Sequence, residues 1–400
     1  MFGWEFPPYY SGGLGTACFG LTKSMSKLGA QITFVIPHAP DDIHSDHVKL
    51  VGASNSKIRI KTVSSILTPY ISENEYNTKY LQHTKGGTGG NYGRNLYEEV
   101  RRYAMKARMI AEEEDFEIIH AHDWLTAVAG VEAKKASGKP LVLHIHATEF
   151  DRTGGNPNQY VYDIERYGMH NADRIIAVSN FTKEKIVNHY GVPADKVEVV
   201  HNAVEFSDKK FNKGSFGINK EDKVVLFLGR ITIQKGPDYF LYAAKKVLES
   251  DPHVKFVMAG NGDMQPFIIE KAAELGIADR LLFTGFLRGP DIDRAYAMAD
   301  LYVMPSVSEP FGITPLEALR NNTPVLISKQ SGVSEVLQNC LKVDFWDVHD
   351  MANKIIATLK YRPLHEELTS NGVEEVYRFS WDNPARKCLN VYEDVLRGVM

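Results

Sequence analysis

Cysteine is scarce in this chain, and its few copies lie far apart. The three cysteines are Cys18, Cys340 and Cys388 among 400 residues. Domains stapled by disulfides usually carry an even number of closely spaced cysteines, and zinc-binding modules carry closely spaced pairs. Neither pattern is present, so we expect free thiols. A reducing cytoplasm is then the expected location.

Long apolar runs and an excess of positive charge are also missing. No run approaches the roughly 18 apolar residues of a membrane span, and Met1–Pro8 lacks the basic start and cleavage site of a signal peptide. The net charge is −4, whereas nucleic-acid binders normally carry a basic excess. We predict no stable membrane insertion and no nucleic-acid partner. An anionic ligand stays possible, because a pocket can be basic on an acidic protein.

What the sequence does contain is an alternation of short β-branched runs with amphipathic helical patterns, such as Gly13–Leu28, Asn95–Glu113 and Pro237–Ser250. The runs are apolar on both faces, as buried parallel strands require. This order predicts an α/β fold with parallel sheets. The predicted strands are Ile32–Ile36, Ile118–His122, Leu141–His146, Arg174–Val178, Val197–His201, Val224–Gly229, Val254–Ala259, Leu281–Thr284, Leu301–Pro305 and Pro324–Ser328.

The length exceeds what one hydrophobic core usually fills, so two domains are expected. The polar, glycine-dotted stretch Val204–Lys223 is predicted to link them. This places one domain at residues 1–205 and the other at 206–382, followed by a C-terminal helix at about 383–400. The segment Asp41–Gly93 is irregular and ends in a glycine-rich run that predicts a loop. Met1–Pro8 reads as the end of a short first strand. Parallel sheets bind ligands at the carboxyl ends of their strands, so two such sheets suggest a cleft between domains.

Two cations cluster where the first strand of the second domain ends. Arg230 follows that strand, and Lys235 precedes the helix that begins near Pro237. Arginine binds phosphate through two parallel hydrogen bonds, lysine adds a point charge, and a helix N-terminus adds free N–H donors. The combination predicts a diphosphate site. A solvated loop is the alternative for these two residues taken alone.

A second cluster follows the predicted strand Leu301–Pro305. Glu309 lies in the loop after this strand, and Glu317 falls about two turns later. Between them, Phe311, Gly312 and Ile313 can present backbone N–H groups as a helix begins. Two carboxylates around such donors suit a sugar-nucleotide, one binding sugar hydroxyls and the other ribose hydroxyls. The alternative is a capped helix with solvent-facing glutamates.

The run Ser11–Thr16 contains Gly12 and Gly13 and precedes a predicted helix. Glycines there permit close backbone approach to an anion. The run lacks both the dinucleotide-binding glycine fingerprint and the lysine of a phosphate-binding loop. A tight structural turn is therefore equally compatible with it.

Two histidine pairs end neighbouring strands, at His120 and His122 and at His144 and His146. Residues two apart on a strand share a face, so each pair has metal-ligand spacing. A metal-dependent hydrolase is therefore a rival prediction, although no third carboxylate–histidine cluster accompanies the pairs. The alternative for His120 and His144 is a buried, hydrogen-bonded imidazole. His146 and Asp123 have the best positions for polar contacts at the predicted cleft.

Asp291 and Asp293 have the spacing of a metal-binding Asp-x-Asp motif. They also open a predicted helix, Asp291–Met298, where aspartates are expected for capping and for the helix dipole. The capping role is the preferred interpretation.

Taken in order, these motifs resemble the retaining glycosyltransferases that include bacterial and archaeal glycogen synthases (glycosyltransferase group 1, family 4-like). The resemblance covers nearly the whole chain and is specific for the superfamily. One departure is the loop Tyr9-Tyr10-Ser11-Gly12-Gly13, where many glycogen synthases have Lys-x-Gly-Gly. The motifs that carry it are Gly12-Gly13, His122-Asp123-Trp124, His146, Ser179-Asn180, His201–Val204, Gly229-Arg230, Gln234–Gly236 and Glu309 followed after seven residues by Glu317.

The resemblance implies a GT-B fold, in which two Rossmann-like domains face each other and a C-terminal helix returns to the first. It implies that Arg230 and Lys235 hold the donor diphosphate, Glu317 the ribose and Glu309 the sugar. His146 would contact the sugar near C6, and Asp123 would lie on the acceptor side. Residues implied to line the rest of the donor site are Gly12, Gly13, Asn261, Gly262, Phe286, Phe311, Gly312, Ile313, Gly332 and Val333.

The implied reaction transfers a hexose, glucose first of all, from a nucleoside-diphosphate sugar such as ADP-glucose or UDP-glucose to a carbohydrate acceptor. Neither a metal nor another cofactor is expected. An alternative is a transferase that uses a UDP- or GDP-sugar on a lipid, polysaccharide or small-molecule acceptor.

Overall fold

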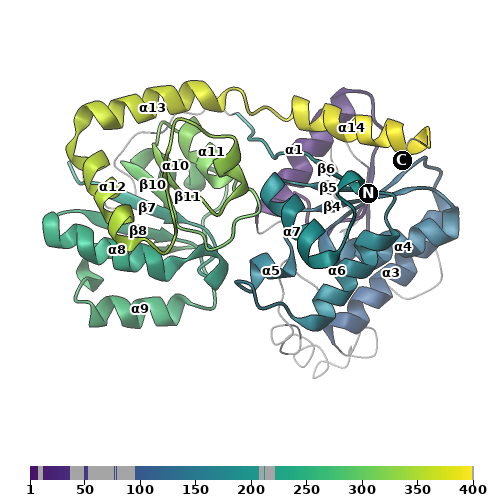
Figure 1. The fold of residues 1–400 in the computed structure, drawn as a ribbon, viewed down its shortest axis with the longest axis horizontal. Coiled ribbons are helices and arrows are strands. Elements are labelled where there is room, and N and C mark those ends of the chain that lie inside the picture. Colours follow the sequence, from purple (N-terminus) through teal and green to yellow (C-terminus); the bar gives the residue numbers. More distant parts are fainter. Residues whose placement is uncertain are drawn as a thin grey trace. The chain divides into compact units, whose positions relative to one another are not determined.

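The computed structural model describes residues 1–7, 12–36, 49–52, 76, 78, 95–206, 211 and 221–398. The chain divides into two compact units, each built around a parallel sheet (Figure 1). Unit 1 comprises Met1–Thr148, Asn158–Asn202 and Trp381–Met400, and unit 2 comprises Glu149–Pro157 and Ala203–Ser380.

The sheet of unit 1 has two groups of parallel strands. One has the order β3-β4-β5-β6, and the other pairs β1 with β2. Phe2 bridges Val35 of β1 and Ala121 of β3, so the first residues join the two groups. Among the described residues the expected first strand is thus reduced to isolated bridge positions at Phe2 and Phe6. The strands are β1 (Thr33–Ile36), β2 (Lys49–Gly52), β3 (Ile119–His122), β4 (Leu141–Ile145), β5 (Arg174–Ala177) and β6 (Val197–Val199).

Unit 1 ends with a helix from the far end of the chain. Helix α14 packs against α1 (yellow and purple in Figure 1). At this contact a Cβ atom on Gly20 would lie 2.2 Å from Nε1 of Trp381, so only glycine fits. Ser24 also donates a hydrogen bond of 2.9 Å to Asp382. The helices of this unit are α1 (Gly13–Lys27), α3 (Leu96–Glu113), α4 (Asp123–Ser137), α6 (Gln159–Asn171), α7 (Asn180–Tyr190), η2 (Ala194–Lys196) and α14 (Asp382–Leu396).

Unit 2 has a six-stranded parallel sheet with the order β12-β11-β10-β7-β8-β9. Its core includes Phe227, Phe240 and Phe256, which contact one another edge to face or at a tilt. The strands are β7 (Val224–Leu228), β8 (Lys255–Ala259), β9 (Leu281–Gly285), β10 (Leu301–Met304), β11 (Val325–Ser328) and β12 (Leu341–Val343). The helices are α5 (Glu149–Arg152), η3 (Ile233–Lys235), α8 (Pro237–Ser250), α9 (Gln265–Glu274), η4 (Ala278–Arg280), α10 (Pro290–Met298), α11 (Thr314–Arg320), η5 (Gly332–Glu335), α12 (Val348–Lys360) and α13 (Arg362–Val376).

All ten predicted strands are present, with ends shifted by one or two residues. The sequence did not predict β2 and β12, which are short and have weak β-branched patterns. The predicted domain limits at 205 and 382 lie within three residues of the unit limits at 202 and 380. One segment differs: Glu149–Pro157, placed in the first domain from sequence, packs in unit 2. The predicted glycine-rich loop and most of the predicted linker lie outside the described residues.

The structure also bears on the cysteines and on membrane-spanning segments. All three cysteines are free, which confirms the expected absence of disulfides. Across the described ranges, no helix is both long and apolar enough to cross a membrane.

Candidate functional site

Lys235 and Glu309 form an ion pair at the carboxyl ends of the strands of unit 2. The Lys235 ammonium lies 2.5 Å from Oε2 of Glu309. The Ser306 hydroxyl donates a second hydrogen bond of 3.1 Å to the same oxygen. Glu309 is buried, with 6 % of its surface exposed. A buried carboxylate held by a cation and a hydroxyl is a strong, oriented polar group.

Gln234, which the sequence analysis placed in a motif without giving it a role, links Arg230 to the loop that carries Glu309. Arg230 donates a 3.0 Å hydrogen bond to the Gln234 side-chain oxygen. The Gln234 amide in turn donates to the Ser308 carbonyl at 3.1 Å. Gln234 is buried, so its amide orients Arg230 rather than meeting solvent. Its position directly before Lys235 was the feature of the sequence that could have pointed to this role.

A glycine lets this loop cross the end of β10. Gly236 has φ of 62°, and a Cβ atom there would lie 2.2 Å from the Pro305 carbonyl oxygen. A left-handed glycine is therefore required between η3 and α8. The close approach fixes Lys235 above the strand that leads to Ser306 and Glu309.

The predicted Glu309–Ile313 and Gly332-Val333 segments, far apart in sequence, lie side by side. The Gly332 N–H donates to the Glu309 carbonyl at 2.9 Å, and the Val333 N–H donates to the Phe311 carbonyl at 2.7 Å. Gly312 takes a left-handed conformation with φ of 100°. Helix α11 begins at Thr314, so the N–H groups of its first turn have no acceptor within the helix.

Glu317 lies within α11, one turn after its start. The Tyr296 hydroxyl of α10 donates a 3.1 Å hydrogen bond to Oε2 of Glu317. Burial raises the pKa of Glu317 above its usual value, against the lowering influence of Arg320. The predicted ribose ligand is therefore a desolvated carboxyl group oriented by a fully buried tyrosine, Tyr296, which the sequence analysis did not identify.

Asn261 and Gly262 lie against the Arg230 loop. The Ile231 N–H donates to the Asn261 carbonyl at 2.9 Å. A Cβ atom on Gly262 would lie 2.1 Å from the Ile231 carbonyl oxygen, so backbone meets backbone here. Phe286 follows β9 with 43 % of its surface exposed, and the Arg288 guanidinium lies 5.3 Å from its ring centre. An exposed ring of this kind is available for stacking.

The segment Glu149–Pro157, which packs in unit 2 rather than in unit 1, contacts the loop that carries Glu309. The Ser308 hydroxyl donates a 2.5 Å hydrogen bond to Asp151 of α5. Both side chains are buried. Asp151 thus anchors α5 beside the loop that carries Glu309, a contact across 157 positions that local sequence patterns cannot reveal.

In unit 1 the two histidine pairs form one group, which we call the histidine cluster: His120, His122 and His144, which are buried, and His146, which is half-buried. The register pairs His122 of β3 with His144 of β4. Ring centres are 4.4 Å apart within the first pair and 4.1 Å apart within the second. The Tyr392 hydroxyl of α14 contacts Nδ1 of His120. Burial, followed by neighbouring imidazoles, holds the pKa of His120, His122 and His144 well below the usual range. It lowers the pKa of His146 to about 3.

Asp123 fixes the backbone that carries His146. Its Oδ1 accepts hydrogen bonds from the N–H groups of His146 at 2.6 Å and Ala147 at 3.2 Å. Asp123 has φ of 59°, a left-handed conformation that aspartate tolerates better than most residues. Such strain persists only where the surroundings hold it, and it concentrates at functional sites.

Gly12 and Gly13 lie at the start of α1. A Cβ atom on Gly13 would meet no described atom within 4 Å, so packing among these residues does not explain the glycine. The buried carboxylate of Glu5 accepts a 2.7 Å hydrogen bond from the Gly15 N–H. Glu5, missed from sequence, thus braces this helix start.

The histidine pairs can be compared with the ligand spacing of a metal site, the rival prediction from sequence. Ligand atoms of Cys18, His122 and His146 lie within 4.8 Å of one another, as do those of His120, His122 and His144. Both sets share His122, whose Nδ1 lies 3.0 Å from Nε2 of His146.

The Asp-x-Asp pair lies in the first turn of α10, where the helix dipole favours acidic residues, but neither aspartate is the N-cap, which is Gly289. Asp291 accepts a 2.8 Å hydrogen bond from Arg294 on the same helix. Asp293 accepts hydrogen bonds from Arg320 at 2.6 Å and Asn321 at 2.9 Å. Both carboxylates have partners of their own in unit 2.

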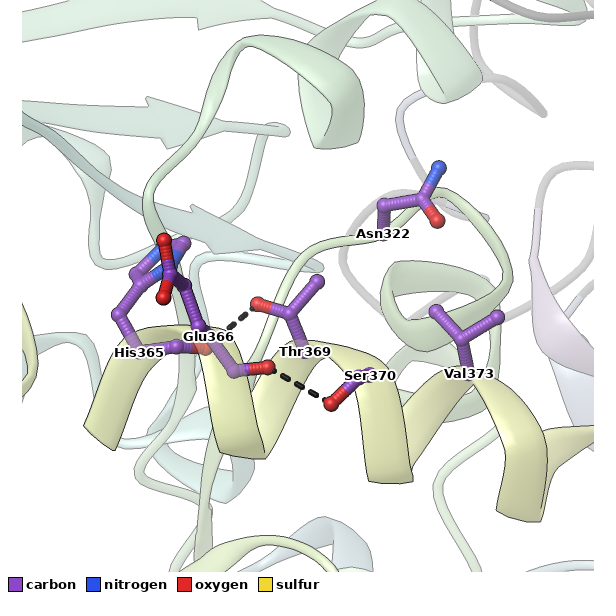
Figure 2. Close-up of a pocket in the computed structure, with 6 residues that line it drawn as sticks. All are labelled: Asn322, His365, Glu366, Thr369, Ser370 and Val373. Atoms are coloured by element: carbon purple, nitrogen blue, oxygen red, sulfur yellow. Dashed lines mark hydrogen bonds between the residues drawn. The ribbon is translucent and has the colours of Figure 1, made fainter. Parts of the chain in front are cut away.

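A surface cavity of about 540 Å³ lies along α13, and no predicted site residue lines it (Figure 2). Its two hydroxyls turn back onto their own helix. Thr369 donates to the His365 carbonyl at 2.8 Å, and Ser370 donates to the Glu366 carbonyl at 2.9 Å. Both hydroxyls are thus taken up by their own helix, and the cavity is not the candidate site. Its lining residues are Asn322, His365, Glu366, Thr369, Ser370 and Val373.

Two parallel Rossmann-like sheets and this arrangement of residues define a sugar-transferring class of protein. Residues 208–375 match the family "Glycosyl transferases group 1", and residues 11–208 match "Glycosyltransferase Family 4". The chain belongs to the group 1 glycosyltransferases, enzymes with the GT-B fold.

Several known proteins are similar over most of the chain. An uncharacterized glycosyltransferase of Methanocaldococcus jannaschii is 30 % identical, covering 98 % of this chain and 97 % of the relative. A D-inositol 3-phosphate glycosyltransferase of Nocardioides is 27 % identical over 69 % of this chain and 67 % of its own. Sucrose-phosphate synthase from Thermosynechococcus elongatus has a TM-score of 0.78 at 19 % identity, covering 99 % of this chain and 98 % of that one. HepE of Anabaena, solved with UDP-glucose, has a TM-score of 0.70 at 17 % identity, covering 98 % of both chains.

The structure therefore brings the predicted residues together in two groups. Arg230, Lys235 and Glu309 lie together in unit 2, and the implied nucleotide-side glycines and asparagine pack against their loops. Asp123 and His146 lie together in unit 1. Family membership assigns transfer of a sugar to this chain rather than the metal-dependent hydrolysis that the histidine pairs allowed.

Proposed function

We propose that this enzyme transfers a hexose from a nucleoside-diphosphate hexose to a hydroxyl group of a carbohydrate, with retention of configuration at the anomeric carbon. The observation that carries the proposal is the pairing of Lys235 with Glu309 beside Arg230. It joins cations suited to a diphosphate with a carboxylate suited to sugar hydroxyls.

The chemistry requires stabilisation of a leaving group. As the bond from the anomeric carbon to the diphosphate breaks, negative charge builds on the phosphate oxygens and positive charge on the sugar ring. Arg230 and Lys235 would stabilise the phosphate charge as fixed cations that need no rearrangement. Lys235 must then exchange part of its contact with Glu309 for phosphate oxygens. No metal is required by this arrangement.

Glu309, once relieved of part of its lysine contact, can accept hydrogen bonds from the hydroxyls at C3 and C4 of the donor sugar. Glu317 would accept from the ribose, its position set by Tyr296. Phe286, half exposed after β9, would face the base. Each of these groups is an acceptor or an apolar face, matching the hydroxyl-rich and aromatic parts of a nucleotide-sugar.

Retention requires the acceptor to attack the face from which the diphosphate leaves. The leaving phosphate then accepts the proton of the attacking hydroxyl, so the reaction needs no dedicated protein base. His146 and Asp123 would lie at the sugar and acceptor side. Exclusion of water is essential, because water would otherwise hydrolyse the donor.

Named relatives support the choice of donor and suggest a second acceptor class. HepE was solved with UDP and glucose and with UDP-glucose, so UDP-glucose is the first donor to test beside ADP-glucose. Two similar proteins are named for small phosphorylated compounds, a sucrose-phosphate synthase and a D-inositol 3-phosphate glycosyltransferase. A small phosphorylated sugar or polyol is therefore the second candidate acceptor beside an α-glucan.

The test combines a donor screen with product analysis. Thermal shift against UDP-, ADP- and GDP-hexoses identifies the donor, because a tight ligand raises the unfolding temperature by mass action. Transfer is then measured with α-glucan, sugar-phosphate and inositol-phosphate acceptors, and the anomeric configuration of the product is read by NMR. An α-linked product from an α-linked donor is expected. An inverted product, or release of nucleotide without any transfer, overturns the proposal.

A further inference from the structure

Three members of the histidine cluster, His120, His122 and His144, are buried in unit 1, where each imidazole nitrogen needs a hydrogen-bond partner. The structure supplies three contacts. Nδ1 of His120 meets the Tyr392 hydroxyl, Nε2 of His120 lies 3.3 Å from Nδ1 of His144, and Nδ1 of His122 lies 3.0 Å from Nε2 of His146. Among the described residues, Nε2 of His122 and Nε2 of His144 have no partner. These orphan atoms restrict where the protons lie.

A neutral imidazole carries one N–H and one bare nitrogen. The contact between His122 and His146 therefore has two possible forms. In one, His122 donates from Nδ1 and leaves Nε2 bare. In the other, His146 donates from Nε2, and the proton of His122 must lie on its orphaned Nε2.

The two forms differ in what they bury. The second form buries an N–H without an acceptor, which native proteins avoid more strictly than an under-used acceptor. The first form buries only a bare nitrogen. Because His122 is fully buried, the first form is favoured, and His122 donates to His146.

The consequence falls on His146. When Nε2 of His146 accepts a hydrogen bond, its own proton must lie on Nδ1. The hydrogen bond made by one ring nitrogen of a histidine sets which form the other adopts. Nδ1 of His146 has no partner among the described residues, so it is the nitrogen available to a ligand.

We propose that His122 is a positioning residue that fixes His146 in its Nδ1-protonated form, so that His146 presents an N–H donor to an oxygen of the donor sugar. This inference rests on the proposed function for the identity of the ligand. Asp123 holds the backbone of His146 through two hydrogen bonds, and His122 holds its ring. His146 is thus pre-organised before any substrate binds.

The first experiment reads the proton directly. The full-length protein is labelled with ¹⁵N-histidine, and long-range ¹H–¹⁵N spectra are recorded, with His146 assigned by its loss in His146→Gln. A protonated Nδ1 and a bare Nε2 in the wild type are expected. A protonated Nε2 overturns the inference.

Two substitutions of His122 supply a matched pair. His122→Asn keeps an N–H donor near the position of Nδ1, whereas His122→Phe keeps a planar ring beside Phe34, with which His122 stacks at 5.9 Å. We expect Asn to retain the His146 spectrum and most of the activity. In His122→Phe we expect His146 to be no longer held in its Nδ1-protonated form. The loss of one oriented hydrogen bond should then lower kcat/KM about tenfold, mainly by raising the KM for the donor.

The outcomes separate this inference from the proposed function. If the wild type transfers sugar while His146 is protonated on Nε2, the inference fails and the function stands. If no nucleotide-sugar supports transfer but the spectrum is as expected, the function fails and the positioning of His146 stands. Equal spectra and activity for the Phe and Asn variants show a packing role only and overturn the inference. If His122→Phe does not fold, the wild-type spectrum and the Asn variant decide.

Discussion

In unit 2 the predicted site residues are charged and paired, with Lys235 and Glu309 in a 2.5 Å ion pair. In unit 1 His146 and its neighbour His122 are imidazoles whose pKa values burial holds below the usual range, and Asp123 accepts hydrogen bonds from the backbone. Charged groups suit a diphosphate that carries charge throughout the reaction. Neutral donors suit sugar oxygens, which carry little. Under the proposed function, charged groups act on the diphosphate and neutral imidazoles on the sugar, and each prediction below tests one side of this contrast.

The largest effect is expected from removing the cation of unit 2. Lys235→Ala should lower kcat/KM by about 10²–10³, the usual loss for one group that stabilises a transition-state charge. Steady-state kinetics with the identified donor measures it. The control is Lys329→Ala, which breaks a 2.7 Å pair with Asp344 on the surface of the same unit and should leave turnover unchanged. A folded Lys235→Ala protein with near-full activity would sink the assignment.

Next comes an effect of acid on the stability of unit 1. The folded pKa values of the histidine cluster lie below the unfolded value of about 6.5, so below that pH the unfolded chain binds more protons than the folded one. Stability is therefore full above pH 6.5 and falls as the pH drops, by about 1.4 kcal/mol per pH unit for each excess proton. Unfolding temperatures from pH 8 to pH 5 check this.

The matched pair for this prediction is His144→Leu and His349→Leu. His144 is buried in the cluster, and His349 is exposed on α12. The His144 variant should show a shallower fall of unfolding temperature with acid, whereas the His349 variant should follow the wild type. Identical slopes for all three proteins would mean that the cluster is not the source.

A smaller effect on activity is expected at the glycine loop. The Cβ atom added by Gly13→Ala would meet no described atom within 4 Å, so the fold should survive. A methyl group beside the proposed phosphates should nevertheless displace the donor and lower kcat/KM by roughly tenfold or more.

Gly130→Ala is the comparison, because its Cβ would lie 2.8 Å from Leu141. Overpacking should destabilise it by about 1–3 kcal/mol while leaving kcat/KM near the wild-type value at low temperature. Calorimetry measures the stability of both variants, and steady-state kinetics measures their kcat/KM. If Gly13→Ala keeps full activity, Gly13 is only a turn.

The smallest effect is expected at Glu317. Tyr296→Phe removes one hydrogen bond to this carboxylate, worth about 1 kcal/mol, and should raise the donor KM roughly fivefold with kcat little changed. Kinetics at several donor concentrations separates the two constants. A change confined to kcat would argue that Tyr296 acts on the chemical step.

The raised pKa of Glu317 also predicts how the substitution Glu317→Gln changes stability. Burial raises the folded pKa of Glu317 above its unfolded value, so the charged form costs stability once the pH exceeds both values. Glu317→Gln should therefore unfold at a higher temperature than the wild type at neutral pH and lose this advantage in acid, while binding the donor more weakly. Thermal unfolding at pH 4 and pH 7.5 checks the sign.

The sequence predicted those parts of the fold that have local patterns. Runs such as Val224–Gly229 have the β-branched composition of buried strands, and glycine and proline mark the ends of helices such as α8. Strand β12 (Leu341–Val343) escaped, because it pairs with β11 through contacts that its own composition does not specify. The segment Glu149–Pro157 escaped because its place depends on Asp151 meeting Ser308, a contact between distant residues.

The site divides in the same way. Residues that bear charge next to a strand end, such as Arg230 and Glu309, could be picked out from sequence. The groups that orient them could not: Gln234, Tyr296 and Glu5 act through partners that are revealed only when the chain folds. The roles of His120 and His122 depended equally on the register of two strands, which placed four rings in one cluster.

The two units are not consecutive pieces of chain. The chain changes unit after residues 148, 157, 202 and 380, and the last stretch returns α14 and its Tyr392 to His120. A ribosome makes the first strands of unit 1 long before this helix exists. Unit 2 has most of its residues in one stretch from 203 to 380 and can fold during synthesis, as contiguous domains generally do. Unit 1, although begun first, is finished last, so a newly made chain keeps part of its histidine-bearing unit uncovered until its final twenty residues leave the ribosome.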